Sequence, residues 1–218
     1  MNRLPLLFML LMFSFSSFGI DIGALTYSLD YDKGFITKEV FNNAESRKIY
    51  TINVYEINRP GKEEKSINLD SRELLFTPKQ FTLNAYSKKQ VKFYFNGNGN
   101  REKYYRVEFT EIAAPVSSQF NMTMNMVIKL SSILVVKPKN HKLDYILDFN
   151  KNLITNSGTS YFEIIIKKHC NSSDMESNSR YITPGETYFN GDITEKSNIV
   201  IIYNNKYKYV NEKCNIGN

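Results

Sequence analysis

The sequence predicts an all-β protein with two sandwich-like domains, for three reasons. Segments that alternate between apolar and polar residues recur along the 218 residues, with turn residues between them at intervals typical of sandwiches. Tyrosine and phenylalanine contribute 15 residues each, and this aromatic content favours strands. No stretch of useful length follows a helical period. The length suffices for one or two domains that each bury a core.

Residues 1–19 predict a secretory signal peptide. Arg3 supplies a short positive start, and an apolar stretch at 4–18 follows it. Ser17 and Gly19 place small residues at the two positions that a signal peptidase reads, so the mature chain is expected to begin at Ile20. An uncleaved membrane anchor is the alternative, but the stretch is somewhat short for a span of ~20 residues. The protein is therefore expected to be exported and soluble.

The first domain, residues 20–137, is predicted to contain seven strands. Pro78 ends the short fourth strand, because proline cannot donate a ladder hydrogen bond. The Asn-Gly-Asn-Gly-Asn run at 96–100 joins two strands, so it is interpreted as a hairpin turn and not as a phosphate-binding loop. The predicted strands are 22–29, 34–42, 47–57, 73–78, 90–95, 102–113 and 120–137.

The last of these strands is too long for an ordinary sandwich. Residues 120–130 alternate strictly, and Val127 alone is apolar on the polar side. Residues 133–136 are apolar on both faces, which indicates burial from both sides. At ~3.3 Å per residue the strand would span roughly 60 Å, whereas a domain of this size is about 30 Å across. It is therefore expected to bend or to overhang its neighbours. Its apolar side is formed by Phe120, Met122, Met124, Met126, Ile128 and Leu130.

A hinge at residues 138–141 and a smaller second domain at 142–218 complete the chain. The composition changes at Pro138, and strand patterns begin again after it. The pattern is typical of a second β-sandwich or of a barrel. Its predicted segments are 143–149, 152–160 with an internal turn, 161–168, and a hairpin at 198–210 about Asn204 and Asn205.

Cys170 and Cys214 predict a disulfide within the second domain, because an even number of cysteines in an exported chain favours pairing. The loop of about 45 residues would contribute on the order of 4 kcal/mol in the chain-entropy model. The alternative is a nucleophilic pair of Cys170 with His169. It is disfavoured because adjacent strand residues point to opposite faces.

Charge and motifs argue against several functions. The formal net charge is +6, but the cations are scattered and form no stripe that would track phosphates, so no nucleic-acid partner is expected. The two histidines lie in no cluster with metal-ligand spacing. Gly-x-Ser-x-Gly and Walker motifs are missing from the sequence. We expect no enzyme activity, metal or cofactor. Glu63 and Glu64 are interpreted as solvated charges in a loop.

The apolar side of the long strand is the best candidate for a binding surface. Lining its own core is the alternative, and it is the usual role of such a face. Three of the six apolar residues are methionines, whose unbranched side chains suit a surface that must fit more than one partner. A strand donated to another protein is a known recognition mode.

Five segments give the chain a specific resemblance, in order and over nearly the whole mature length: residues 73–95, 104–111 (YYRVEFTE), 131–138 (SSILVVKP), 152–164 and 181–188 (YITPGETY). They resemble the periplasmic chaperones of the chaperone–usher pilus pathway, in particular the common-pilus (Mat/ECP) type. The resemblance implies two immunoglobulin-like β-sandwich domains in a boomerang arrangement, with Lys137 and Pro138 at the hinge.

The resemblance also implies a function. Such a chaperone stays in the periplasm and lends its long strand to fimbrial subunits that lack their last strand. It then delivers each subunit to an outer-membrane usher, without a cofactor or nucleotide. Self-association through the free strand is a further consequence of an exposed apolar edge.

In this family, cations in the cleft between the domains hold the C-terminal carboxylate of the subunit. The chain departs from the best-known branch, because its first strand has no cation and the late position falls in the apolar segment 132–135. Two candidates remain, Arg106 and Lys129. Arg106 ranks first because a planar guanidinium binds a carboxylate with two hydrogen bonds. A solvated strand charge is the alternative for both, and Lys137 is a candidate for an interdomain ion pair.

The alternative function is a secreted two-domain β-sandwich adhesin or a structural component of the pilus. A pilus subunit should carry its own N-terminal donor extension and lack a complete sandwich. Residues 20–29 are short for such an extension, and the first domain has its seven predicted strands. The pattern therefore favours the chaperone.

Overall fold

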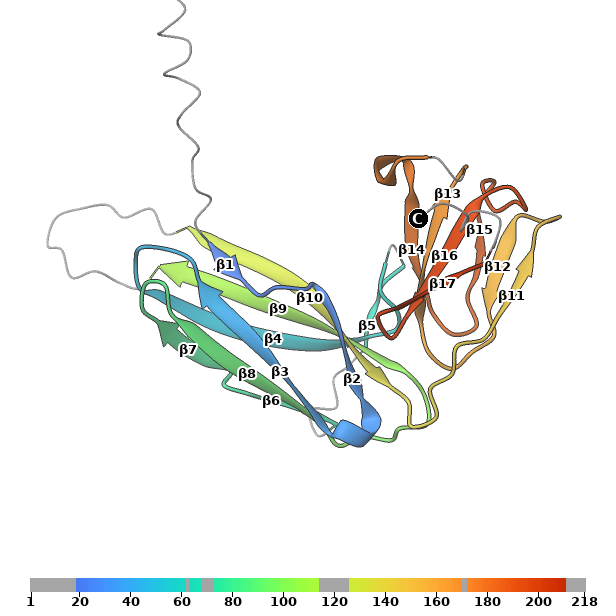
Figure 1. The fold of residues 1–218 in the computed structure, drawn as a ribbon. Helices are drawn as coiled ribbons and strands as arrows, with labels where there is room; N and C mark the ends of the chain where they lie inside the picture. Colours follow the sequence, from blue (N-terminus) through green and yellow to red (C-terminus); the bar gives the residue numbers. More distant parts are fainter. Residues whose placement is uncertain (1–18, 62, 68–72, 114–125, 170–171, 211–218) are drawn as a thin grey trace, which may run out of the picture.

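The computed structural model describes residues 19–61, 63–67, 73–113, 126–169 and 172–210. Two β-sandwiches meet at a bend, so the chain has the predicted boomerang shape (Figure 1). Within the described residues no helix is long and apolar enough to span a bilayer. Several predictions lie outside these residues: the signal peptide before Gly19, the donor residues Phe120, Met122 and Met124, and the disulfide Cys170–Cys214.

Two sheets form the first sandwich. One has the strand order β1 (Ile20–Asp21), β3 (Phe35–Asn42), β8 (Lys88–Phe95) and β6 (Leu74–Thr77). The other has the order β2 (Thr26–Asp30), β10 (Val127–Lys137), β9 (Lys103–Ala113), β4 (Lys48–Ile57) and β5 (Ser66–Ile67), and β7 (Gln80–Leu83) also pairs with β4.

The first predicted strand, 22–29, is wrong as a single element. Only its second half is a strand, β2, which pairs with β10, whereas β1 ends at Asp21, before the predicted start, and pairs with β3 in the other sheet. Gly23 breaks the strand with a φ of +63°, a conformation that glycine adopts without steric cost. Its N–H donates to Asp21 Oδ1 at 2.7 Å. The buried Lys38 then ties the crossing segment to β3 by donating to the Ala24 carbonyl.

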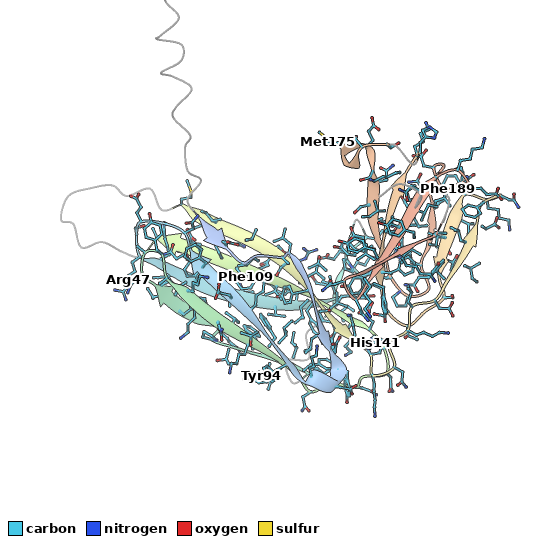
Figure 2. The ribbon with its side chains drawn as sticks, in the orientation of Figure 1. Arg47, Tyr94, Phe109, His141, Met175 and Phe189 are labelled. Atoms are coloured by element: carbon cyan, nitrogen blue, oxygen red, sulfur yellow. The ribbon has the colours of Figure 1, made fainter. Side chains whose placement is uncertain are left out.

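Alternating side chains from both sheets fill the core of this sandwich. Tyr105, Val107 and Phe109 of β9 are fully buried and face residues of β8 such as Val91 and Phe93. Figure 2 shows Phe109 inside the sandwich and Tyr94, on β8, on its outer face. The strands predicted at 90–95 and 102–113 are therefore confirmed, as β8 and β9.

The second sandwich is smaller. Its three-stranded sheet has the order β11 (Tyr145–Asp148), β12 (Leu153–Asn156) and β15 (Thr187–Phe189). Its four-stranded sheet has the order β14 (Asn178–Ile182), β13 (Phe162–Lys167), β16 (Asn198–Tyr203) and β17 (Lys206–Tyr209). Asn204 and Asn205 have φ of 53° and 59° between β16 and β17, as expected for a two-residue hairpin turn. Short 3₁₀ turns lie at Tyr31–Lys33 (η1) and Asp174–Glu176 (η2).

Replacing Gly158 by alanine should destabilise the second domain. The Gly158 N–H donates to the Asp144 carbonyl at 3.0 Å, so the two backbones lie in contact. An added Cβ would stand 2.8 Å from Asp144 N and closer still to the Lys142 carbonyl. Because backbone cannot move aside as a side-chain tip can, we expect a loss of about 1–3 kcal/mol in the free energy of unfolding. Chemical denaturation measures it.

Gly191→Ala is the matched control in the same domain. A Cβ at Gly191 meets nothing within 4 Å, and we expect a change within about 0.5 kcal/mol. Equal unfolding midpoints for the two variants would contradict the packing described here.

Candidate functional site

The free edge of β10 is the first part of the candidate site. β9 pairs with β10 from Val127 to Val136, but β2 covers its other edge only from Ile133 to Lys137. Ile133 N–H donates to the Leu25 carbonyl at 2.7 Å and so points to the β2 side. Since backbone groups alternate along a strand, those of Val127, Lys129 and Ser131 point to the same side. None of the described strands pairs with them there.

The apolar side of β10 passes from exposed to buried along the strand. Met126 is 70% exposed, whereas Ile128 and Leu130 are half-buried. Leu130 packs against the core of its own sandwich, so its side chain is not wholly free for a partner. The regular alternation of the sequence could not reveal this change in burial, because the pattern does not show where the neighbouring sheet ends.

The second half of β10 is buried on both faces, as predicted. Leu134 and Val136 belong to the sandwich core. Ile133 and Val135 instead form a cluster on the outer face of the sheet with Ile57 and Tyr104, and Tyr161 of the second domain packs against it. This cluster is the apolar part of the interdomain contact.

Arg106 lies on the outer face of β9, where the free edge of β10 ends. Its Cα partners are Tyr55 on β4 and Ile133 on β10. Its Nη1 donates to Ser131 Oγ at 3.1 Å, which fixes the guanidinium beside the last open residue of β10. The neighbouring pair, Tyr104 and Val135, lies in the apolar cluster that Tyr161 contacts. Arg106 therefore lies two residues along β9 from the apolar contact between the domains.

The guanidinium already binds a carboxylate of the same chain. Arg106 Nε donates to Glu64 Oε1 at 3.0 Å, and Nη2 donates to Glu64 Oε2. The side chains are only 28% and 22% exposed. The interpretation of Glu64 as a solvated loop charge is therefore wrong. Its partner is 42 positions away, so a sequence pattern gives no signal for the pair.

Lys129, the second candidate, is exposed on the same face. It lies opposite Thr110, four residues along β10 from the position paired with Arg106. At ~3.3 Å per residue the two positions are roughly 13 Å apart along the strand. A single carboxylate cannot contact both cations at that separation unless the long side chains converge.

Lys137 and Pro138 are buried at the hinge, as their predicted position requires. Lys137 Nζ donates to Asn204 Oδ1 of the second domain, and it lies 3.6 Å from Asp30 Oδ1 of the first. The interdomain interaction is thus a hydrogen bond to a neutral amide, and the ion pair lies within the first domain. The expectation of an interdomain ion pair is corrected accordingly.

Glu102 is the carboxylate that joins the two domains. The Tyr161 N–H donates to both of its oxygens at 3.0 Å, and the hydroxyls of Ser160 and Tyr104 donate as well. Burial raises the pKa of Glu102, although the hydrogen bonds from Ser160, Tyr104 and Tyr161 oppose the shift. No pattern in the sequence indicates this role, because a glutamate at the start of a strand resembles any solvated charge.

One of the cavities between the domains has a volume of about 490 Å³ and is lined by Asp30, Lys137, His141 and Tyr203 among others. Within the described residues, His, Cys, Asp and Glu do not gather in groups of three or more that could hold a metal ion. The open edge of β10 has the geometry to accept an added strand, and the Arg106 guanidinium can bind a carboxylate.

Removing Glu102 should loosen the two domains. Glu102→Ala leaves a buried backbone N–H and two hydroxyls without their acceptor, and we expect a loss of about 2–4 kcal/mol in the free energy of unfolding. Glu102→Gln keeps an acceptor and should lose less. Because the pKa of Glu102 is raised in the folded state, the stability that its protonated carboxyl contributes is lost as the pH rises through that pKa.

The Gln variant should therefore gain stability relative to wild type as the pH increases from about 4.3, the ordinary value for glutamate. Denaturation at a series of pH values tests this, and small-angle scattering reports the interdomain angle. A difference between Gln variant and wild type that does not change with pH would contradict the buried carboxylate.

Comparison with known proteins places these features in context. The family described as "Pili and flagellar-assembly chaperone, PapD N-terminal domain" matches residues 20–142. A curated relative, the "Probable fimbrial chaperone EcpE" of Escherichia coli strain K12, is 32% identical over 201 residues, with 89% of this chain and 85% of the relative covered.

Two solved complexes contain similar chains. One is the SafA pilin of Salmonella enterica with the SafB chaperone, at TM-score 0.59 and 15% identity, covering 86% of this chain and 90% of that chain. The other is the CsuC–CsuE chaperone–tip adhesion subunit pre-assembly complex from the archaic chaperone–usher Csu pili of Acinetobacter baumannii. It has a TM-score of 0.57 and 15% identity, and covers 89% of this chain and 97% of that chain. These two likenesses concern the fold, and they agree with the two-sandwich architecture.

Proposed function

The chain belongs to the fimbrial chaperones of the chaperone–usher pathway, and from that premise we propose that it binds fimbrial subunits by donor-strand complementation. In this proposal β10 is added to a subunit along its free edge. The apolar side chains that precede and begin β10 fill a groove in the subunit. The chaperone acts in the periplasm and then delivers the subunit to an outer-membrane usher. The role requires binding and release, with no catalytic step.

The observation that carries this proposal is the half-covered strand. Val127, Lys129 and Ser131 offer backbone donors and acceptors along one edge, and β2 begins to cover that edge only at Ile133. An added strand therefore has a defined end, at Leu25 and Ile133. Main-chain hydrogen bonds supply affinity in this mode, and pockets for alternate side chains supply specificity.

Arg106 supports the proposal as the group that sets the register. A subunit strand whose last residue reaches the end of the open edge would place its terminal carboxylate beside Ser131 and Arg106. Such a strand runs parallel to β10, because both then end at the hinge side. A guanidinium forms two parallel hydrogen bonds with a carboxylate. Lys129 lies too far from this end to be the first choice.

Apolar burial limits the affinity. Each fully buried side chain contributes ~1.5–3 kcal/mol, and six donor residues give an upper bound of roughly 9–18 kcal/mol before the costs of association. Because Leu130 already contacts its own core, its share is smaller. Among the described residues, Met126 and Ile128 are the side chains expected to contribute most of this apolar burial.

Periplasmic co-expression with fimbrial subunits tests the proposal. We expect a stable one-to-one complex with a subunit whose C-terminal strand pairs with β10. A chaperone that leaves every subunit unbound, while it folds and is exported normally, would overturn the proposal. The alternative of an adhesin or structural pilus component does not agree with membership of the chaperone family.

A further inference from the structure

We propose that Glu64 is a competing internal ligand of Arg106, which a subunit displaces with its own C-terminal carboxylate. The inference rests on the proposed role of Arg106 as the anchor. It assigns to Glu64 a role in specificity. A client that displaces Glu64 breaks the Glu64–Arg106 pair, and only a client with a carboxylate at the end of the β10 edge replaces it with an equivalent pair.

Glu64 binds Arg106 with the geometry that is expected of a subunit's C-terminal carboxylate. Both oxygens of Glu64 accept from the guanidinium, one from Nε and one from Nη2. A C-terminal carboxylate has the same charge, the same two oxygens and the same planar fit to the fork of arginine. The two ligands therefore compete for one site, because they use the same donors.

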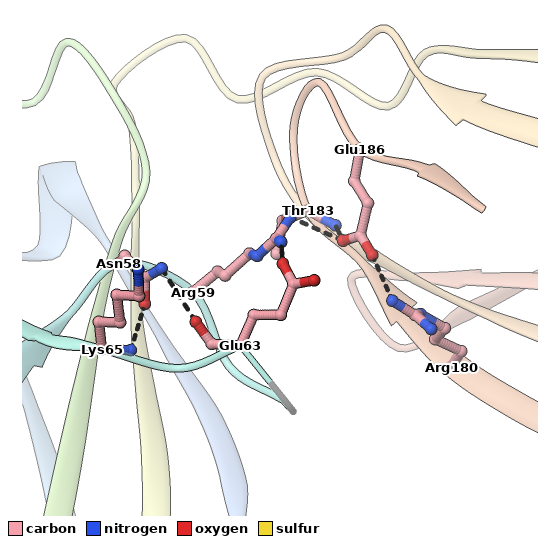
Figure 3. A network of polar contacts seen from close by, with 7 residues as sticks. All are labelled: Asn58, Arg59, Glu63, Lys65, Arg180, Thr183 and Glu186. Carbon is pink, nitrogen blue, oxygen red and sulfur yellow. Dashed lines mark hydrogen bonds and ion pairs between the residues drawn. The ribbon is translucent and has the colours of Figure 1, made fainter.

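The loop that carries Glu64 is held in place by its own contacts. Asn58 is the centre of these contacts: its N–H donates to the Lys65 carbonyl at 3.1 Å, and its Oδ1 accepts from the Lys65 N–H at 2.7 Å. Its Nδ2 also donates to the Glu63 carbonyl at 3.2 Å, and Arg59 pairs with Glu63 (Figure 3). Glu64 N–H donates to the Gly61 carbonyl at 3.2 Å. Glu64 is therefore presented to Arg106 by an organised loop.

The loop also faces the second domain. Arg59, Gly61 and Glu63 line a shared cavity with Arg180 and Glu186 of the second domain. Figure 3 shows the loop of residues 58–65 facing the segment that carries Thr183 and Glu186 of the second domain. The loop thus forms one wall of this cavity, and Glu64 reaches from the loop to Arg106, which in turn contacts Ser131 of β10.

Competition makes a specific prediction about Glu64→Gln. The variant removes the charge but keeps the size of the side chain, so Arg106 becomes available without loss of the loop. The native carboxylate of the client then no longer has to displace a charged competitor. We expect this client to bind about three- to tenfold tighter, the range for a partly exposed charge-assisted pair.

The probe is the subunit that co-purifies with the wild-type chaperone, in two forms. One has its native C terminus, and the other carries a two-glycine extension that moves the carboxylate away. Affinities are measured for the wild-type chaperone and for Glu64→Gln, Arg106→Ala and the double variant. Glu39→Gln is the control, because Glu39 is exposed on β3 and its ion-pair partner among the described residues is Lys88, far from Arg106 in the fold.

We expect Glu64→Gln to tighten the native form and to leave the extended form unchanged. In the Arg106→Ala background it should have no effect. Equal or weaker binding of the native form by Glu64→Gln would overturn the proposal, since Glu64 would then only position the guanidinium. A gain that persists without Arg106 would overturn it as well. If Arg106→Ala binds the native form as tightly as wild type does, then Arg106 does not bind the subunit carboxylate, and the register proposed for the subunit strand is wrong.

Discussion

Replacing Met126 and Ile128 together by aspartate should reduce the affinity for a fimbrial subunit by roughly a hundredfold or more. Each residue would otherwise bury an apolar side chain worth ~1.5–3 kcal/mol in the groove of the subunit, and 1.4 kcal/mol is a factor of ten in affinity. The aspartates also carry charges into an apolar groove, which raises the cost further. Titration of the purified chaperone with a refolding subunit measures the loss.

Val127→Asp is the matched control. It introduces the same side chain between the two tested positions, but Val127 is 54% exposed and lies on the opposite side of β10. We expect this variant to bind nearly as wild type. Equal losses from the control and the double variant would mean that the apolar side of β10 has no special role, and the donor-strand assignment would be wrong.

Arg106→Ala should weaken subunit binding about tenfold to a hundredfold. Hydrogen bonds to charged groups contribute about 1.5–3 kcal/mol, and the variant removes both donors of the fork. Arg106→Lys should fall between alanine and wild type, because an ammonium keeps the charge but loses the planar pair of donors. The effect on folding should be small, since Glu64 regains access to water when its partner is removed.

Lys129→Ala separates the two candidate anchors. Lys129 is exposed and lies four residues from the end of the open edge, so we expect little change in affinity. A loss with Lys129→Ala and none with Arg106→Ala would reverse the assignment and move the expected end of the subunit strand by about 13 Å. Affinity measurements on the three single variants decide between these outcomes.

Alternation was the property that made most of the fold predictable. In β4, β8 and β9 every second residue is buried over most of the length, as the sequence pattern indicated. The doubly apolar stretch of β10 is buried on both faces because a second domain packs on its outer side, which the continuous apolar run anticipated. These features are properties of single strands, and a periodic pattern reports which residues of a single strand are buried.

Features that depend on two distant segments could not be predicted in the same way. A single glycine, Gly23, moves the chain from one sheet to the other, and an Ile-Asp-Ile-Gly run does not show which sheet each half joins. The Glu64–Arg106 and Glu102–Tyr161 contacts join residues 42 and 59 positions apart. Nothing in the local sequence distinguishes these glutamates from solvated ones.

The candidate site was therefore predicted in part. Arg106 was ranked first because a guanidinium binds a carboxylate with two hydrogen bonds, and its position at the end of the open edge supports that choice. The carboxylate that already occupies it was interpreted as a surface charge. The sequence could not show that Glu64 is partly buried, because its burial depends on how the loop around Asn58 packs on the sheet. Strand β5, which follows this loop, pairs with β4 only through Ser66 and Ile67.

Amide hydrogen exchange along β10, followed by NMR in the free chaperone and in its subunit complex, tests the central claim most directly. The N–H groups of Lys129 and Ser131 point to the open edge, whereas those of Ile128 and Leu130 point to β9. We predict fast exchange of Lys129 and Ser131 in the free protein and strong protection in the complex, with Ile128 and Leu130 protected in both. Fast exchange of Lys129 and Ser131 in a stable complex would show that the subunit does not add a strand at this edge.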